Sequence, residues 1–211
     1  MSVVLYGAPS TASLVVHWLL IELGVEHRLE MLDFEAGEQR SPAYLALNPQ
    51  GRVPTLVIGE QVLTESAAIA MHLADLYPDA GLAPAVGTPA RGDYYRWICF
   101  GVYTLMPAYR AWFYPHEPAG PAHTEIVRDR ARAQIEAAWQ QVAVHLAVGG
   151  PYLLGNGPCT ADCLLTMLMR WSRAMPQPSD RWPELAAFAR RMKDRPAFQT
   201  ACRREGIQDW L

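Results

Sequence analysis

The first eighty residues alternate between short apolar runs and longer stretches with helical spacing. Residues 3–6 form a short β-rich run, and a stretch that begins at residue 10 or 12 and ends at 23 carries apolar side chains three and four positions apart. Gly24 follows that stretch, as expected of a glycine just past a helix C-terminus. Residues 27–32 alternate between polar and apolar positions and predict a second strand.

The pattern continues with a second helix and a hairpin. Pro42 occupies the favoured first position of a short helix that ends at residue 47. Residues 55–58 and 61–63 predict two strands joined by a turn at residues 59–60, and residues 66–76 return to helical spacing. The order β-α-β-α-β-β-α predicts a small mixed sheet with helices on its faces.

Glycine and proline interrupt this pattern over residues 79–89, and no strand pattern follows them. We therefore predict a first domain over residues 1–79, a linker over 80–90 and an all-α domain over 91–211. The helices expected in the second domain cover residues 91–113, 124–148, 160–172, 183–191 and 196–203.

Composition narrows the function classes. The chain has 211 residues, is 51% hydrophobic and carries a formal charge of -3, so it lacks the basic excess that nucleic-acid binding requires. No run of 18 apolar residues indicates a membrane span, and no basic leader precedes the first strand, so we expect a cytoplasmic protein. The four cysteines, Cys99, Cys159, Cys163 and Cys202, match no paired metal-site spacing and are interpreted as free thiols. We expect no metal.

The most informative loop is Asn48-Pro-Gln-Gly-Arg-Val-Pro54, just before the predicted strand at residues 55–58. A proline at the mouth of a strand donates no ladder hydrogen bond, so Val53 could offer its own N–H and C=O to an extended ligand. If the Val53-Pro54 bond is cis, it is of the kind that folds retain to shape a site. The loop therefore predicts a peptide-binding site built from backbone.

Glu65 and Ser66 open the helix predicted over residues 66–76. A hydroxyl and free N–H groups at the positive end of a helix dipole suit a carboxylate, and Glu65 could pair with a nearby ammonium group. An ordinary helix cap is the alternative for this pair, and the preceding Val-Pro loop favours the binding interpretation.

Four motifs in this order and spacing resemble the cytosolic glutathione transferase family along nearly the whole chain. They are the N-terminal LYGAPSTA at residues 5–12, the NPQGRVP loop at 48–54, the ESAAI helix start at 65–69, and the stretch from Gly155 to Asp162. The resemblance implies a thioredoxin-like first domain, a helical second domain and a homodimer. It also implies that glutathione binds the first domain and that an apolar electrophile binds between the two domains.

In this resemblance, Val53 and Pro54 face the cysteinyl unit of glutathione, with Val53 bonded antiparallel to it, and Glu65 and Ser66 hold the γ-glutamyl end. Gln50 or Arg52 could reach the glycyl carboxylate. Arg52 is the better electrostatic candidate, because a guanidinium binds a carboxylate through two charged bonds. Gln39 occupies a position from which similar families also contact the glycyl end.

Conjugation requires the glutathione thiol as a thiolate, which a hydroxyl donor and a helix N-terminus would stabilise. By resemblance to plant-type members, Ser10 is the favoured donor to the thiolate, Thr11 is its competitor and Ser13 comes third; helix capping is the alternative for each. Tyr6 is a further possible phenol donor but fits better as a packing residue. No cysteine precedes Cys99, which argues against thiol-disulfide chemistry at this turn.

The electrophile would meet an aromatic-rich helix, from which Tyr103, Met106 and Arg110 are the candidates; core or dimer packing is the alternative for each. The leading function is conjugation of glutathione to an apolar small molecule, as in detoxification. Rival functions are glutathione-dependent peroxide reduction, disulfide-bond reduction, isomerisation or dehalogenation, and non-catalytic binding of a ligand or partner.

Asp162 is interpreted as structural. Similar proteins place a Ser or Thr three residues before this aspartate as a capping box, and here that position holds Cys159 with Thr160 next to it. The sequence therefore departs from the usual cap of a buried helix at this point.

Overall fold

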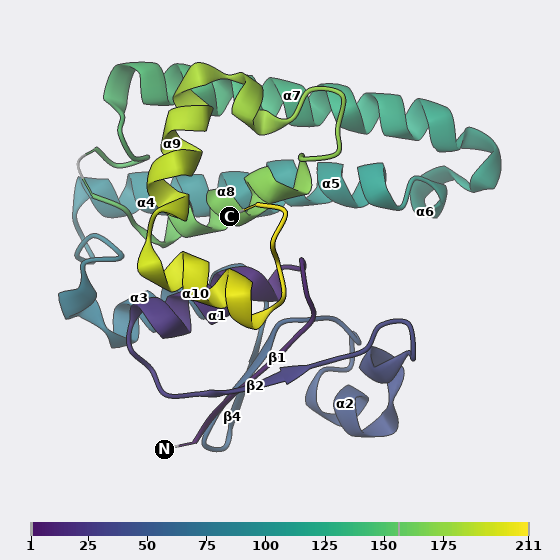
Figure 1. The fold of residues 1–211 in the computed structure, drawn as a ribbon, viewed down its shortest axis with the longest axis vertical. Helices are drawn as coiled ribbons and strands as arrows, with labels where there is room; N and C mark the ends of the chain where they lie inside the picture. Colours follow the sequence, from purple (N-terminus) through teal and green to yellow (C-terminus); the bar gives the residue numbers. More distant parts are fainter. Residues whose placement is uncertain (1, 156, 211) are drawn as a thin grey trace. The chain divides into compact units, whose positions relative to one another are not determined.

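The computed structural model describes residues 2–155 and 157–210, and these fall into two compact units (Figure 1). The sheet unit comprises Met1–Ala83 with Lys193–Leu211, and the helical unit comprises Pro84–Met192. None of the described helices is both long enough and apolar enough to cross a membrane.

The sheet unit is built on four strands in the order β2-β1-β3-β4, with β1 parallel to β2 and antiparallel to β3. The predicted order β-α-β-α-β-β-α and the predicted mixed sheet are confirmed. The strands are β1 (Val3–Gly7), β2 (Arg28–Met31), β3 (Thr55–Ile58) and β4 (Gln61–Thr64). The helices are α1 (Ser13–Glu22), α2 (Pro42–Leu47), α3 (Ser66–Leu76), α10 (Pro196–Arg204) and the short 3-10 turns η1 (Glu38–Arg40) and η2 (Pro78–Ala80).

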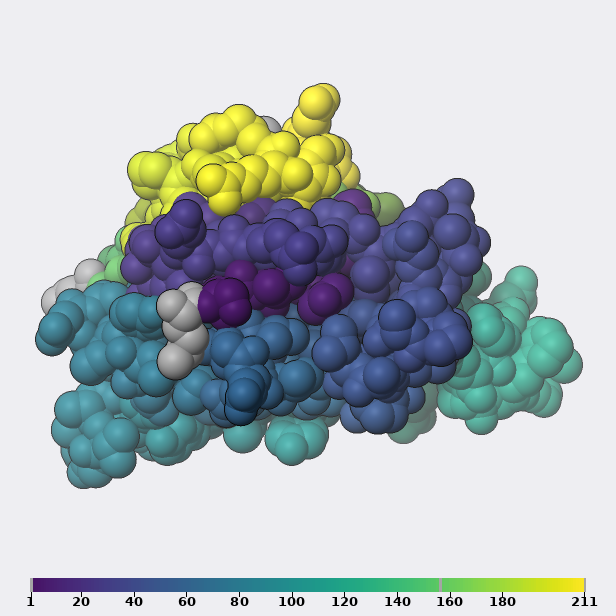
Figure 2. Space-filling model, turned by 90° about the horizontal axis from the view of Figure 1, so that it is seen from below, coloured from purple at the N-terminus to yellow at the C-terminus, as the bar shows by residue number. Residues whose placement is uncertain are grey.

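Helix α1 is buried on every side, from Ser13 to Leu20. A helix that is apolar all round needs cover beyond one sheet face, and α1 packs against β1, α3 and α10. Trp18 meets the ring of Phe198 on α10 with the centroids 4.8 Å apart, and Arg195 forms an ion pair with Glu22. Figure 1 shows α10 alongside α1, and in Figure 2 the yellow C-terminal residues lie against an indigo band of early residues, next to the dark purple N-terminal residues.

This packing differs from the predicted division, in which residues 91–211 form one helical domain. The structure groups 193–211 with the sheet unit, because α10 covers the apolar side of α1. Helix spacing along the sequence identifies α10 as a helix but carries no information about which apolar surface it covers.

The helical unit contains no strand among its described residues, as the sequence predicted. Its elements are α4 (Pro89–Phe100), the π-helix η3 (Gly101–Leu105), α5 (Met106–Phe113), α6 (His116–Ala119), η4 (Pro121–His123), α7 (Thr124–Gly149), α8 (Thr160–Trp171), η5 (Ser179–Arg181) and α9 (Pro183–Lys193). Helix α4 begins inside the predicted linker, because the Thr88 hydroxyl accepts a hydrogen bond from the Arg91 N–H and Pro89 takes the first position.

The single helix predicted over residues 91–113 is interrupted by η3. At Gly101 the chain passes so close to α8 that a Cβ atom would lie 3.0 Å from the Leu164 side chain. A π-helical turn adds a residue without ending the helix, so the helical pattern of the sequence continues through it.

Helix α8 begins with a cap that the sequence did not lead us to expect. Asp162 accepts hydrogen bonds from the Cys159 N–H at 2.8 Å, the Cys159 thiol at 3.0 Å and the Leu153 N–H at 2.9 Å. The thiol of Cys159 thus stands where the resemblance implies a hydroxyl. Burial raises the pKa of Asp162 and also raises the pKa of the Cys159 thiol, which keeps that thiol protonated as a donor.

Candidate functional site

The strand register brings four segments to one end of the sheet. Tyr6 on β1 pairs with Thr55 on β3, and Thr55 pairs with Thr64 on β4, while Gly7 pairs with Met31 at the end of β2. Neighbouring strands lie about 4.8 Å apart. The chain therefore leaves or enters the sheet at this end through the four segments that contain the predicted glutathione-binding residues, namely 8–12, 32–40, 48–54 and 65–66.

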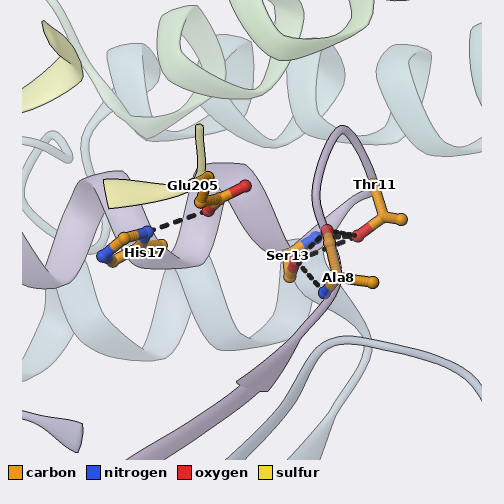
Figure 3. Close-up of polar contacts among 5 residues, drawn as sticks. All are labelled: Ala8, Thr11, Ser13, His17 and Glu205. Carbon is orange, nitrogen blue, oxygen red and sulfur yellow. Dashed lines mark hydrogen bonds and ion pairs between the residues drawn. The ribbon is translucent and has the colours of Figure 1, made fainter. Parts of the chain in front are cut away.

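The turn after β1 is closed by its own hydroxyl groups (Figure 3). The Thr11 hydroxyl donates to the Ala8 carbonyl at 2.7 Å, and the Ser13 hydroxyl lies 2.9 Å from Thr11 and 3.1 Å from the same carbonyl. The Ala8 N–H donates to the Ser13 hydroxyl at 3.2 Å. Gly7 makes room for this arrangement, since a Cβ there would lie 2.7 Å from the Ser13 hydroxyl oxygen.

This turn also explains why α1 begins at Ser13, later than the predicted start at residue 10 or 12. Ser10 has a φ of 63°, a left-handed conformation that a helix does not accept. Ser10 is half-buried at the tip of the turn. The Ala12 N–H has no acceptor among the described residues. The tip of the turn therefore holds the Ser10 side chain and an open backbone donor at Ala12, close to the positive end of α1.

The loop at residues 48–54 is organised from inside by Asn48. Its Oδ1 accepts from the Gln50 N–H at 3.1 Å, and its carbonyl accepts from the Gly51 N–H at 2.9 Å. Gly51 has a φ of 60° and lies where a Cβ would meet the Gln39 carbonyl at 2.8 Å, so only glycine fits without a shift. The Val53-Pro54 peptide bond is cis.

Val53 keeps its main chain unpaired. Neither its N–H nor its C=O has a hydrogen-bond partner among the described residues, although the residue is only half-buried and lies two positions before β3. Backbone groups in proteins are almost always paired or hydrated. A strand-like donor and acceptor that stay open at the end of a sheet can bind an extended peptide.

Three polar side chains around this loop differ in their exposure and in the hydrogen bonds that they already make. The Arg52 guanidinium is exposed and makes no hydrogen bond or ion pair with the described residues, and the exposed Gln50 side chain makes none either. Gln39 is half-buried, and its Oε1 is buried without a described partner. Arg52 is thus the cation in this loop that can reach an incoming carboxylate without breaking a bond.

Glu65 and Ser66 stand at the start of α3. Glu65 has a φ of 70°, and it precedes the first helical turn as the cap residue. Backbone strain of this kind in a residue other than glycine is concentrated at functional sites. Ser66 is buried, and its hydroxyl has no described partner. The first N–H groups of α3 have no partner inside the helix and face the same end of the sheet.

The three residues predicted for the electrophile lie in the helical unit, but they are not gathered in one hollow. Tyr103 is exposed and lines a hollow of about 450 Å³ between the η3–α5 segment and α7, with Thr104, Pro107, Ala108, Gln134, Ala137, Ala138 and Gln141. Met106 and Arg110 are not in that lining. Arg110 binds Glu117 through two hydrogen bonds of 2.7 and 2.5 Å and lies over the Tyr114 ring.

The sequence did not predict the polar contacts of Tyr44 and Asn48 or the pairing of His17, a residue that we expected to be a packing histidine rather than a catalyst. Tyr44 lies on α2 and Asn48 is its C-terminal cap residue, and both bond to the Arg52 carbonyl. His17 pairs with Glu205 at 2.8 Å inside the sheet unit, where both side chains are fully buried (Figure 3). Among the described residues, no group of three His, Cys, Asp or Glu side chains is placed to hold a metal ion.

Comparison with known proteins places the chain in a family. The sequence model described as "Glutathione S-transferase, N-terminal domain" matches residues 1–75. Glutathione S-transferase GST-4.5 of Xanthomonas campestris pv. campestris is 31% identical over 207 residues, which cover 96% of this chain and 98% of the relative.

Solved structures agree with this placement. A glutathione S-transferase from Xylella fastidiosa matches with a TM-score of 0.89 and 32% identity, over 98% of this chain and 100% of that one. A glutathione transferase homolog from Sulfitobacter, solved with bound glutathione, matches with a TM-score of 0.89 and 26% identity, over 98% of this chain and 99% of that one. The protein therefore belongs to the glutathione S-transferase family of enzymes.

Proposed function

We propose that this enzyme binds reduced glutathione along residues 48–54, stabilises its thiolate at the turn after β1, and directs that thiolate at an apolar electrophile. The observation that carries the proposal is the open main chain of Val53, whose N–H and C=O have no described partner. The cysteinyl unit of an extended tripeptide would pair with both groups, as an added strand pairs with a sheet edge.

Each end of glutathione would meet a group suited to its charge. The γ-glutamyl carboxylate would accept hydrogen bonds from Ser66 and the first N–H groups of α3, while the Glu65 carboxylate would pair with the ammonium group. Arg52 would bind the glycyl carboxylate, because its guanidinium is exposed and makes no described bond. Gln50 and Gln39 would add neutral hydrogen bonds near the same end.

Ser10 is the proposed donor to the thiolate, with Thr11 as the competitor. The Thr11 and Ser13 hydroxyls are engaged inside the turn with each other and with the Ala8 carbonyl. Redirecting either hydroxyl would break bonds that close the turn, and the support for Ser10 is its place at the tip of that turn, with a φ of 63°. The Ala12 N–H adds a second donor at the same place, which favours a thiolate there over a neutral thiol.

For the electrophile, the proposal keeps Tyr103, Met106 and Arg110 as residues of the helical unit that would contact it. Tyr103 is the best supported, because it lines a hollow, whereas the Arg110 guanidinium is engaged by Glu117. Family membership is the support for three further parts of the proposal, namely a homodimer, a cytoplasmic location and a role in detoxification.

The experiment is an ultraviolet titration of thiolate in the protein saturated with reduced glutathione. A free thiol has a pKa of about 8.5, and we expect the bound thiol to titrate at least about one unit lower. A product assay with an apolar electrophile, scored for covalently attached glutathione, then separates conjugation from peroxide reduction or isomerisation. Failure of the wild type to be retained on immobilised glutathione would overturn the proposal.

A further inference from the structure

Two buried side chains converge on the carbonyl oxygen of Arg52. The Tyr44 hydroxyl lies 2.6 Å from this oxygen, and the Asn48 Nδ2 lies 2.8 Å from it. Both side chains come from the segment of α2 and its C-terminal cap, and each residue is 3% exposed. The carbonyl that immediately precedes the open Val53 N–H is therefore held by two donors from inside the protein.

The direction of these hydrogen bonds is fixed by the available protons. The Arg52 carbonyl can only accept, so the single Tyr44 hydroxyl proton goes to it, and the Thr55 hydroxyl, 2.9 Å away, donates to the Tyr44 oxygen. Asn48 also donates to the Thr55 oxygen at 3.2 Å. Burial raises the pKa of Tyr44, so its hydroxyl remains a donor at neutral and mildly alkaline pH.

Peptide geometry transmits this constraint to Val53. The Arg52–Val53 bond is not one of the cis peptide bonds, and in a trans peptide the C=O and N–H point to opposite sides of a rigid plane. Since the carbonyl points at Tyr44 and Asn48, the Val53 N–H must point away from them. That direction leaves the N–H without an acceptor among the described residues.

We infer that Tyr44 is a positioning residue for glutathione, whose hydroxyl aims the Val53 N–H at the ligand through the Arg52 carbonyl. The inference rests on the proposed function, in which that N–H binds the cysteinyl unit. Asn48 supports the same carbonyl from its second side.

The role of the hydroxyl is separable from the role of the ring. The Tyr44 ring packs against Tyr6 with the centroids 5.7 Å apart. Tyr44→Phe keeps that contact while it removes the donor to Arg52 and the acceptor of the Thr55 hydroxyl. Tyr109→Phe is the matched control. Tyr109 is a buried tyrosine of the helical unit whose hydroxyl accepts from the Trp139 indole N–H at 2.9 Å, so the same change deletes a buried hydrogen bond elsewhere.

The experiment measures steady-state kinetics, thermal melting and the backbone amide spectrum of both variants. For Tyr44→Phe we expect the KM for glutathione to rise about three- to tenfold, the range of one neutral hydrogen bond, with kcat at saturating glutathione changed less than about twofold. Tyr109→Phe should lower the melting temperature without raising that KM. In the ligand-free protein, Tyr44→Phe should shift the Val53 amide resonance, and Tyr109→Phe should leave it in place.

An unchanged KM in Tyr44→Phe, or an equal rise in Tyr109→Phe, would overturn the inference. If wild-type protein does not bind glutathione, the proposed function fails, and the Val53 amide resonance still decides whether Tyr44 sets the orientation of that N–H. A Val53 resonance that does not respond to Tyr44→Phe would refute the positioning role in either case.

Discussion

The two loops that contain the proposed site are held in different ways. In the turn of residues 8–13, side-chain hydroxyls close on the backbone of the same turn, so its bonds are local in sequence. In the loop of residues 48–54, side chains from α2 and its cap hold one carbonyl, and the next N–H remains open. The difference teaches that the first loop takes its shape from its own side chains, whereas the second takes its shape from the residues beneath it.

The largest effect should come from deleting the hydroxyl at the tip of the first loop. We expect Ser10→Ala to lower kcat/KM by roughly 10²- to 10³-fold and to raise the pKa of the bound thiol, because a donor to a developing or stable anion is lost. Thr11→Ala should mainly lower the melting temperature, since its hydroxyl closes the turn.

The thiolate titration and steady-state kinetics of these two variants decide which of the two hydroxyls donates to the thiolate. Turnover that survives Ser10→Ala but not Thr11→Ala would reverse the roles assigned to the two residues and would place the chemistry on a hydroxyl that also closes the turn.

A variant that touches neither loop provides the baseline for stability. Asp162→Ala removes the acceptor of three buried hydrogen bonds and should cost about 3 kcal/mol of unfolding free energy. Denaturant unfolding and glutathione titration of the same sample check this. Normal melting together with lost glutathione affinity would contradict the structural role of Asp162.

The binding character of the second loop is tested at Arg52. Arg52→Ala should raise the Kd for glutathione about tenfold, because one charge-assisted contact to the glycyl carboxylate is lost at an exposed site. Arg52→Lys should recover part of the affinity but not all of it, since an ammonium cannot bind a carboxylate in the bidentate manner of a guanidinium. Calorimetric titration separates the two variants, and equal affinity in wild type and Arg52→Ala would move the glycyl contact to Gln50 or Gln39.

The smallest expected effect is the loss of stability at mildly acidic pH, which sets the pH range over which variants of the two loops can be compared. Burial is the main cause that lowers the pKa of His27 below 6.5, so the folded protein binds fewer protons than the unfolded chain just below that pH. The contribution of His27 to stability is therefore present above pH 6.5 and declines as the pH falls through 6.5 toward the folded value. Melting curves at pH 7.5 and 5.5 should show a decrease that is about 2 °C smaller in His27→Gln. An identical decrease in both proteins would contradict this assignment.

Much of the fold could be predicted because hydrophobic periodicity, and glycine and proline at the ends of elements, are local properties of a sequence. The strand of residues 55–58 and the helix of residues 66–76 were found at their observed bounds, and a proline marked the start of α2. The start of α1 was misplaced, because a positive φ at a serine leaves no trace in the hydrophobic pattern.

The candidate site was predictable only in part. Val53 could be proposed from its neighbour Pro54, because a proline restricts the hydrogen bonds of its surroundings. The contribution of Tyr44 could not be proposed from the sequence. An aromatic residue in a short helix is interpreted as a core residue, and the contact of its hydroxyl depends on the tertiary packing of α2 against the loop. The cap at Asp162 could not be predicted either, because Cys159 supplies both a backbone N–H and, unusually, a thiol as donors to it.

The packing of α10 against α1 has a consequence for synthesis on the ribosome. About 170 residues separate the end of α1 from the start of α10, which at roughly 5–20 residues per second corresponds to a delay of about 10 to 35 s. During that interval the nascent chain carries one of its most apolar helices without its partner. Until residues 196–204 have been synthesised, α1 therefore lacks the helix that covers it, and the sheet unit cannot complete its core.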